Sequence, residues 1–170
     1  MKQTIHTGHR KPRWWAFILF PWLAHDKKSV SRKVTFGLNC VYDLEGEEDD
    51  LDVNKIFGLG YLWNKDDSAR FGWNYNNITN RVDLFAYYHV NGLRDFTKIC
   101  SVSVGLQYLM ILNINDQSYS FSVASISTGD EIGNHIVIKT HKKKWSYNMG
   151  MYFGGTLKAP HDITIEINKV

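Results

Sequence analysis

From Lys33 to the C-terminus, short apolar stretches with a two-residue period alternate with clusters of turn-forming residues. A period of two places successive side chains on opposite faces of a strand, which is typical of β-structure with one buried face. The stretch Val82–Val90 shows this alternation, and Asn91-Gly92 directly after it is a strong turn dipeptide. No helical stripe of any length competes with this pattern, so the sequence predicts an all-β protein.

About ten short strands are expected. They cover residues 34–42, 56–63, 69–75, 82–90, 99–104, 108–114, 119–123, 135–140, 147–153 and 163–167. The second and third strands are predicted to form a hairpin whose turn is Asn64–Asp67. Short strands with turns at regular spacing are typical of a sandwich or jelly roll. The predicted fold class is therefore an antiparallel two-sheet sandwich, jelly-roll-like, with an N-terminal arm.

The charge distribution divides the chain. Residues 1–33 carry eight Lys and Arg against Asp26 alone, a net +7, which leaves −4 for the rest of a chain whose total is +3. A length of 170 residues suits one domain with a core of its own. We therefore expect a basic and apolar N-terminal arm at 1–32 and a β-sandwich domain at 33–170.

The arm contains an apolar run of eleven residues, Trp14–Ala24. The run is too short to span a bilayer, contains Pro21 and lacks the small-residue pattern of a cleavage site. We predict that it packs on the sandwich; a membrane-surface anchor and an uncleaved signal are the alternatives. We expect no transmembrane span, a cytoplasmic location, and a homodimer with the arm at its interface.

Two cysteines, Cys40 and Cys100, lie in apolar stretches. Two buried thiols are predicted, and one inter-strand disulfide is the alternative.

Two sequence motifs carry a resemblance. The first is Ser68–Trp73 followed by Val82–Gly92, and the second is Phe153-Gly154-Gly155 followed after three residues by Ala159-Pro160-His161-Asp162. They resemble a group of small uncharacterised bacterial and phage-type proteins, and the strand pattern over 33–168 is similar to concanavalin A-like jelly rolls. The resemblance implies a sandwich with a concave face of the kind used elsewhere for glycans. It transfers no catalytic residue, and fold alone does not determine function.

Motifs of known enzyme and metal sites do not occur in the sequence. G-x-S-x-G, a Walker A loop, H-x-x-x-H and C-x-x-C are all missing, and the acidic loop at 45–52 lacks calcium-loop spacing.

His161-Asp162, just before the last strand, is the one pair suited to a metal or to catalysis. The interpretation we favour is that Asp162 accepts hydrogen bonds from backbone amides and His161 packs over the bend. We expect no cofactor, no metal and no catalytic residue, and a binding protein rather than an enzyme.

Aromatic residues close to Lys and Arg in the sequence are more informative about function than these motifs. Rings occur on both faces of the strand pair 69–75 and 82–90, so one face is core and the other is an aromatic surface with polar tips. Aromatic rings stack on planar ligands, and Lys or Arg pairs with phosphate or carboxylate. The alternative is that the rings are core and the basic run at 139–144 is a solvated hairpin tip. The candidate ligand-binding residues are Trp63, Lys65, Arg70, Trp73, Tyr75, Arg81, Tyr87, His89, Trp145 and His161.

The sequence therefore predicts a non-catalytic protein that holds a polar, ring-containing, anionic ligand on an aromatic and cationic sheet face. A nucleotide is the leading ligand, and sequestration of a signalling nucleotide by a phage-type protein fits this description. A lectin-like glycan-binding domain is the first alternative. The others are a protein-binding inhibitor that acts through the arm and a sandwich-fold lyase or nuclease that uses His161.

Overall fold

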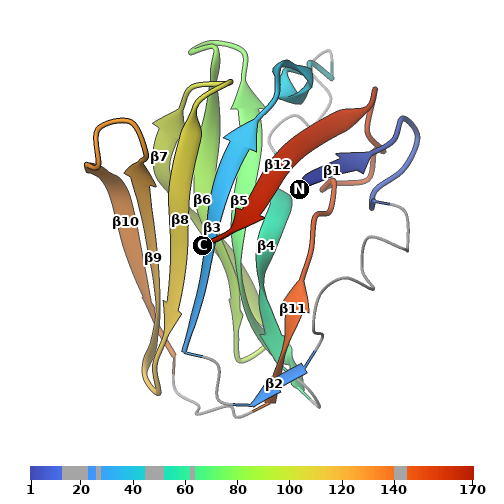
Figure 1. Ribbon diagram of the computed structural model, residues 1–170. Helices are drawn as coiled ribbons and strands as arrows, with labels where there is room; N and C mark the ends of the chain where they lie inside the picture. Colours follow the sequence, from blue (N-terminus) through green and yellow to red (C-terminus); the bar gives the residue numbers. More distant parts are fainter. Residues whose placement is uncertain (13–22, 26–27, 45–51, 62–63, 140–144) are drawn as a thin grey trace.

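The computed structural model describes residues 1–12, 23–25, 28–44, 52–61, 64–139 and 145–170. These residues form twelve strands in two antiparallel six-stranded sheets and one short 3-10 turn, η1 (Leu38–Cys40) (Figure 1). In spatial order sheet A contains β1 (Lys2–Ile5), β12 (Ile163–Lys169), β3 (Ser29–Phe36), β8 (Gln107–Ile114), β9 (Ser118–Ser125) and β10 (Glu131–Ile138). Sheet B contains β2 (Leu23–His25), β11 (Trp145–Met149), β4 (Asn54–Tyr61), β5 (Asn64–Asn76), β6 (Arg81–Val90) and β7 (Leu93–Val102). The predicted all-β sandwich is confirmed.

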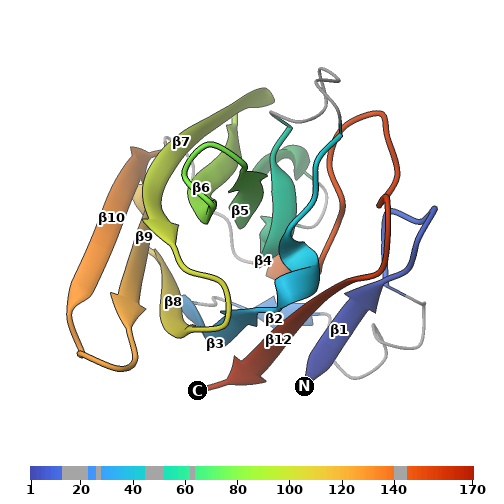
Figure 2. The same ribbon diagram turned by 90° about the horizontal axis from the view of Figure 1, so that it is seen from above.

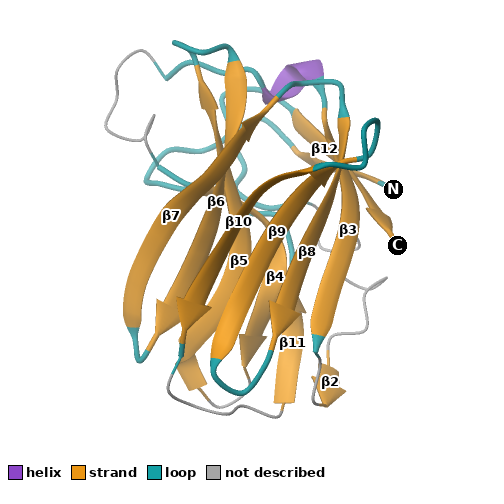
Figure 3. Ribbon diagram, turned by 90° about the vertical axis from the view of Figure 1, so that its left-hand side faces the viewer, coloured by secondary structure: helices purple, strands orange, loops and turns teal. Residues whose placement is uncertain are grey.

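The two sheets pack face to face. Figure 2, which looks down on the molecule, shows β4 to β7 lying against the strands of sheet A, and Figure 3 shows that the long strands of both sheets run in similar directions. Side chains from both sheets meet between them: the Phe71 ring lies 5.1 Å from that of Phe121, and the Trp73 ring lies 5.6 Å from that of Phe36. This is the core of an aligned sandwich.

The alternation on β5 and β6 shows which rings belong to the core. Trp73 is 1% exposed, and on β6 the fully buried residues include Val82, Leu84 and Ala86. Because neighbours along a strand point to opposite faces, Tyr87 and His89 lie on the outer face of sheet B. The outward aromatic face is therefore that of β6, while the rings of β5 face inward.

The hairpin between β6 and β7 turns at Asn91-Gly92 as predicted. Both residues have positive φ angles, 55° for Asn91 and 79° for Gly92. This conformation at both central positions matches the right-handed twist of the flanking strands and is tolerated best by Asn and Gly.

Several expected boundaries were wrong. The strand predicted at 34–42 ends at Phe36, because the chain turns into η1 directly after Gly37. Asn64–Asp67, predicted as a turn, are the first residues of β5. Strands β1 and β2 were not predicted; β1 pairs with β12 and β2 pairs with β11. The division into an arm and a sandwich domain stays a prediction, as does the packing of the run Trp14–Ala24, of which only Leu23 and Ala24 are among the described residues.

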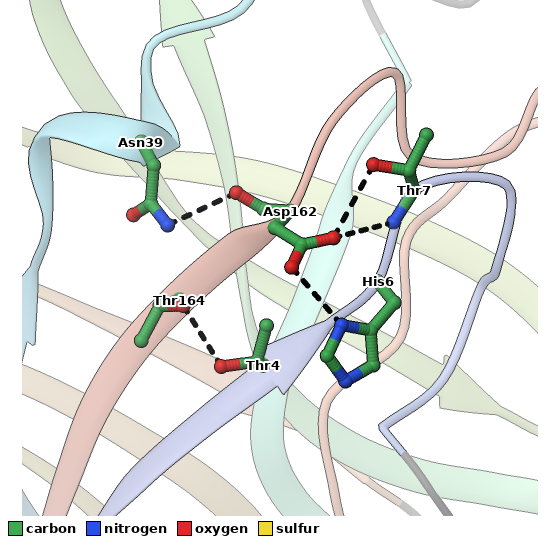
Figure 4. A network of polar contacts seen from close by, with 6 residues as sticks. All are labelled: Thr4, His6, Thr7, Asn39, Asp162 and Thr164. Carbon is green, nitrogen blue, oxygen red and sulfur yellow. Dashed lines mark hydrogen bonds and ion pairs between the residues drawn. The ribbon is translucent and has the colours of Figure 1, made fainter.

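A polar network attaches the N-terminal strand to the start of β12 (Figure 4). The Asp162 carboxylate accepts a hydrogen bond from the Thr7 backbone N–H at 2.9 Å and lies 3.0 Å from His6 Nδ1. The Asn39 side chain donates to the Asp162 backbone oxygen at 2.9 Å. The backbone-amide role expected of Asp162 is thus observed, with the amide coming from the opposite end of the chain rather than from a local turn.

The two cysteines are free thiols, Cys40 buried and Cys100 partly buried. Burial raises the pKa of the Cys40 thiol to about 12. No helix formed by the described residues is long and apolar enough to cross a membrane.

Replacing the central core ring tests the inward orientation of β5. Trp73→Ala should lower the free energy of unfolding by about 3–5 kcal/mol, because it removes a fully buried indole and leaves a cavity. Trp145→Ala is the matched control, since the Trp145 side chain is 45% exposed. Chemical denaturation of the two variants measures the difference, and equal losses would contradict the core position of Trp73.

The Asp162 network should protect the first strand in a pH-dependent way. Its hydrogen bonds to Thr7 and His6 hold the pKa of Asp162 below the ordinary value of 3.8. The contribution of the carboxylate is therefore complete above 3.8 and is lost as the pH falls through the lowered pKa. Asp162→Asn should speed amide hydrogen exchange over residues 2–9 at neutral pH, whereas Asp130→Asn, in an exposed turn, should not. Equal exchange rates in the two variants would show that the network does not restrain β1.

Candidate functional site

A cavity of about 560 Å³ opens on the outer face of sheet B. Its walls come from β4, β5, β6 and β11, from the segment that follows β11, and from the N-terminal region. It is lined by Lys11, Lys55, Ser68, Arg70, Tyr87, His89 and residues 147–152. The volume lies within the range of ordinary small-molecule sites.

The strand register explains why the sheet is hollow here. Across β11, β4, β5 and β6, Tyr147 faces Gly60, Gly60 faces Ser68, and Ser68 faces His89. A Cβ atom at Gly60 would lie 2.6 Å from the ring of Tyr147, so a larger residue there would displace that ring. Long side chains on β6 and β11 therefore border small residues of β4 and β5.

The segment after β11 forms one wall. It is attached to β4 by a pair of backbone hydrogen bonds between Lys55 and Tyr152, of 2.8 and 3.0 Å. The buried Asn54 side chain accepts a third hydrogen bond from the Gly154 N–H at 2.7 Å. The N-terminal region runs alongside, where Lys11 Nζ lies 5.7 Å from the centre of the Tyr152 ring. Lys11, from the basic N-terminal region, thus contributes directly to the cavity.

Arg70 lies on the floor of the cavity. It donates one hydrogen bond, from Nη2 to the Gly150 carbonyl at 2.6 Å, while its Nε is buried without a partner. Burial lowers the pKa of Arg70 to about 10, and the nearby Tyr87, Tyr147 and Tyr152 act in the opposite direction. The guanidinium remains charged at neutral pH but is incompletely paired, a state that an anion would relieve.

Lys55 is another cation of the cavity and is buried, with only 8% of the residue exposed. Its Nζ lies 4.4 Å from the ring centre of Tyr87 and 5.8 Å from that of Tyr152, within reach of cation–π attraction. Burial lowers its pKa to about 8, with further lowering by Arg70 and Arg94 and a partial offset by Asp52. Its charge is therefore sensitive to pH near neutrality.

His89 completes this group of residues. A hydrogen bond of 3.0 Å joins His89 Nδ1 and Ser68 Oγ. Burial and the positive charges of Arg94, Arg70 and Lys55 lower its pKa. The imidazole is therefore neutral at neutral pH and is available as a hydrogen-bonding group.

The described charged side chains that line the cavity are all basic. Lys11, Lys55 and Arg70 line it, and no Asp or Glu side chain does so among the described residues. The described residues also contain no group of three or more His, Cys, Asp or Glu placed to hold a metal ion. Chemically, the arrangement suits an anion with additional hydroxyl or amide groups.

Three of the ten predicted site residues, Arg70, Tyr87 and His89, line the cavity. Trp73 and Tyr75 face the core, since the alternation of β5 directs them inward. Trp63 and the side chain of Lys65 lie outside the described residues.

The other three predicted residues do not line the cavity. Arg81 hydrogen-bonds to Ser103 Oγ at 3.3 Å, Trp145 is exposed, and His161 Nε2 lies 3.0 Å from the Asn39 carbonyl. Arg81 is the first residue of β6, Trp145 is the first residue of β11, and His161 precedes β12; none of the three lies among the residues that line the cavity.

Sequence reasoning missed Lys11, Lys55, Tyr147 and Tyr152. Lys55 left one signal, because a lone cation at the start of the apolar stretch 54–61 is unusual for a buried strand. The others come from distant segments, and no local pattern relates them to β5.

Comparison with known proteins establishes the fold alone. No protein-family model and no curated protein sequence matches the chain. An alginate lyase from Klebsiella pneumoniae is similar with a TM-score of 0.54 and 7% identity, and the match covers 82% of this chain and 56% of the lyase. A functionally unknown protein from Saccharomyces cerevisiae is similar with a TM-score of 0.57 and 9% identity, covering 99% of this chain and 88% of that protein. A xylan β-1,4-xylosidase from Bacillus halodurans C-125 has a TM-score of 0.50 and 8% identity, covering 83% of this chain and 27% of the xylosidase.

These similarities agree with the expected jelly-roll sandwich. At identities of 7–9% they do not transfer residues or activities. The resemblance of the two sequence motifs to bacterial and phage-type proteins stays a prediction.

The lowered pKa of Lys55 predicts a specific pH dependence of stability. Between its folded pKa of about 8 and the ordinary value of 10.5, the unfolded chain binds more protons at this residue than the folded chain. The free energy of unfolding should therefore gain up to about 3 kcal/mol from Lys55 as the pH rises through this window.

Denaturation of Lys55→Met at several pH values measures this contribution, which the variant should lack. Lys28→Met, at an exposed lysine, should keep it. Identical pH profiles for the two variants would contradict the buried, charge-crowded position of Lys55.

Proposed function

We propose that this protein binds an acidic carbohydrate, a sugar carrying carboxylate groups, in the cavity on the outer face of sheet B. The single observation that carries the proposal is that Lys55, which is buried, and Arg70, which is partly buried with an unpartnered Nε, lie in a tyrosine-rich cavity whose described lining contains no carboxylate. Burying cations without anionic partners costs free energy, and an anionic ligand recovers it. The planar guanidinium of Arg70 suits a carboxylate in particular.

The remaining lining suits a sugar. The lining also includes the hydroxyl-bearing Tyr147 and Tyr152 and the imidazole of His89, which can hydrogen-bond to the hydroxyls of a pyranose. The Tyr147 ring adds apolar surface for its C–H groups.

A nucleotide, the ligand that the sequence favoured, is supported less well. The rings of Tyr87 and Tyr152 lie within cation–π distance of Lys55, so a base stacking on them competes with the ammonium group. The described residues also contain no α-helix whose N-terminus could receive a phosphate. The glycan alternative therefore replaces the nucleotide as the leading ligand, with the anionic character retained.

The similar structures give limited additional support. Two of them are named as an alginate lyase and a xylan xylosidase, so this type of sandwich occurs in proteins that act on carbohydrates. Because fold does not determine ligand, the argument depends on the cavity. His161, the residue expected in a lyase or nuclease, does not line this cavity and plays no part in the proposal.

Calorimetric titration with defined carbohydrates tests the proposal. Oligogalacturonate and oligoguluronate should bind, and their affinity should fall as salt is raised because the charges are screened. The methyl ester of the same oligogalacturonate, neutral xylo-oligosaccharides and a panel of nucleotides should bind at least about tenfold more weakly, a difference of about 1.4 kcal/mol.

Substitution identifies the site. Arg70→Met should abolish binding of the acidic oligosaccharides, whereas Arg81→Gln, at an exposed arginine outside the cavity, should leave it unchanged. Equal affinity for the free acid and its methyl ester, or tighter binding of a nucleotide, would contradict the proposed ligand class.

A further inference from the structure

We propose that the binding site continues beyond the cavity onto the edge strand β7, where Phe96 and Arg94 form a second position for an acidic sugar. The ligand is then a chain of at least two such sugars lying across the strands of sheet B. This inference rests on the proposed function and specifies the length and direction of the ligand.

Phe96 presents an apolar ring next to the cavity. The residue is 42% exposed, and its ring lies 6.4 Å from that of Tyr87 with only 9° between the planes. Phe85 supports it edge-on at 5.9 Å. Because Phe85 and Tyr87 are buried and hold the ring in place, Phe96 offers a rigid platform on which the C–H face of a pyranose can pack.

The strand register aligns this platform with the cavity. Arg70 pairs with Tyr87, and Tyr87 pairs with Phe96, so the three side chains form a row across β5, β6 and β7. Neighbouring strands are about 4.8 Å apart, which places the two ends of the row about 10 Å from each other. That span exceeds one pyranose ring, so a ligand that reaches from Arg70 to Phe96 contains more than one sugar.

Arg94 supplies a cation for the second sugar. Arg94 pairs with His89 across β6 and β7, two residues along β7 from Phe96 and on the same face. Its side chain is exposed. The other outward cation of β7, Lys98, is paired with Asp83 at 2.8 Å, whereas no described carboxylate forms an ion pair with Arg94. Its charge also lowers the pKa of both Lys55 and His89, which shows that its field reaches the cavity. The positive potential of the cavity therefore continues to the sheet edge on the Arg94 side.

The test compares ligand length in wild type and variants. Oligogalacturonates and oligoguluronates of two to six residues are titrated by calorimetry. Galacturonate and guluronate monomers are titrated in the same way, and the affinity of wild type should rise from the monomer to the oligomers that reach Phe96. Phe96→Ala should weaken binding of the hexamer about tenfold, a change of about 1.4 kcal/mol, and leave that of the monomer nearly unchanged. Arg94→Gln should likewise affect the hexamer and reduce its salt dependence.

Leu93→Ala is the matched control, since Leu93 is an apolar residue on the same strand with 76% exposure. It should bind every oligomer as wild type does. Equal affinity of wild type for monomer and hexamer, or a Phe96→Ala variant that binds both as wild type does, would overturn the second position and leave the proposed function intact. Failure of every oligouronate to bind wild type would overturn the proposed function and this inference together.

Discussion

The packing of β5 against sheet A is the interaction on which the rest of the structure depends. Phe71 and Trp73 point inward and meet Phe121 and Phe36 across the sandwich. A shift of one residue in register would reverse every side chain of β5, turning Arg70 toward the core and the two rings toward the outer face. The hydrophobic core therefore determines both the fold and the outward position of the cation at the centre of the cavity.

The cavity is maintained by contacts that partly offset the cost of burying charge. The tyrosine rings lie close to the Lys55 ammonium, and one carbonyl accepts a hydrogen bond from Arg70. These partners are neutral, so the two positive charges still repel each other, which contributes to the low pKa of Lys55. A site built in this way is preorganised for an anion, because its cations are already desolvated and held in place before a ligand arrives.

Much of the fold followed from local pattern. The alternation over Val82–Val90 and the Asn91-Gly92 turn predicted the β6–β7 hairpin, since both features depend on a few adjacent residues. Strand β1 was missed because four residues carry little periodic signal and its partner, β12, is at the other end of the chain. Trp73 was predicted as a ligand contact because alternation shows which residues share a face but does not show which face is buried.

The sequence by itself determined the class of fold, the aromatic and cationic character of the region 69–90, and the free state of the thiols as the favoured alternative. These properties depend on composition and short-range periodicity. Only the tertiary structure decided that Arg70, Tyr87 and His89 face outward, and that Lys11, Lys55, Tyr147 and Tyr152 join them around one cavity. That assembly depends on long-range strand register and on the docking of the segment after β11, which bring together residues more than a hundred positions apart.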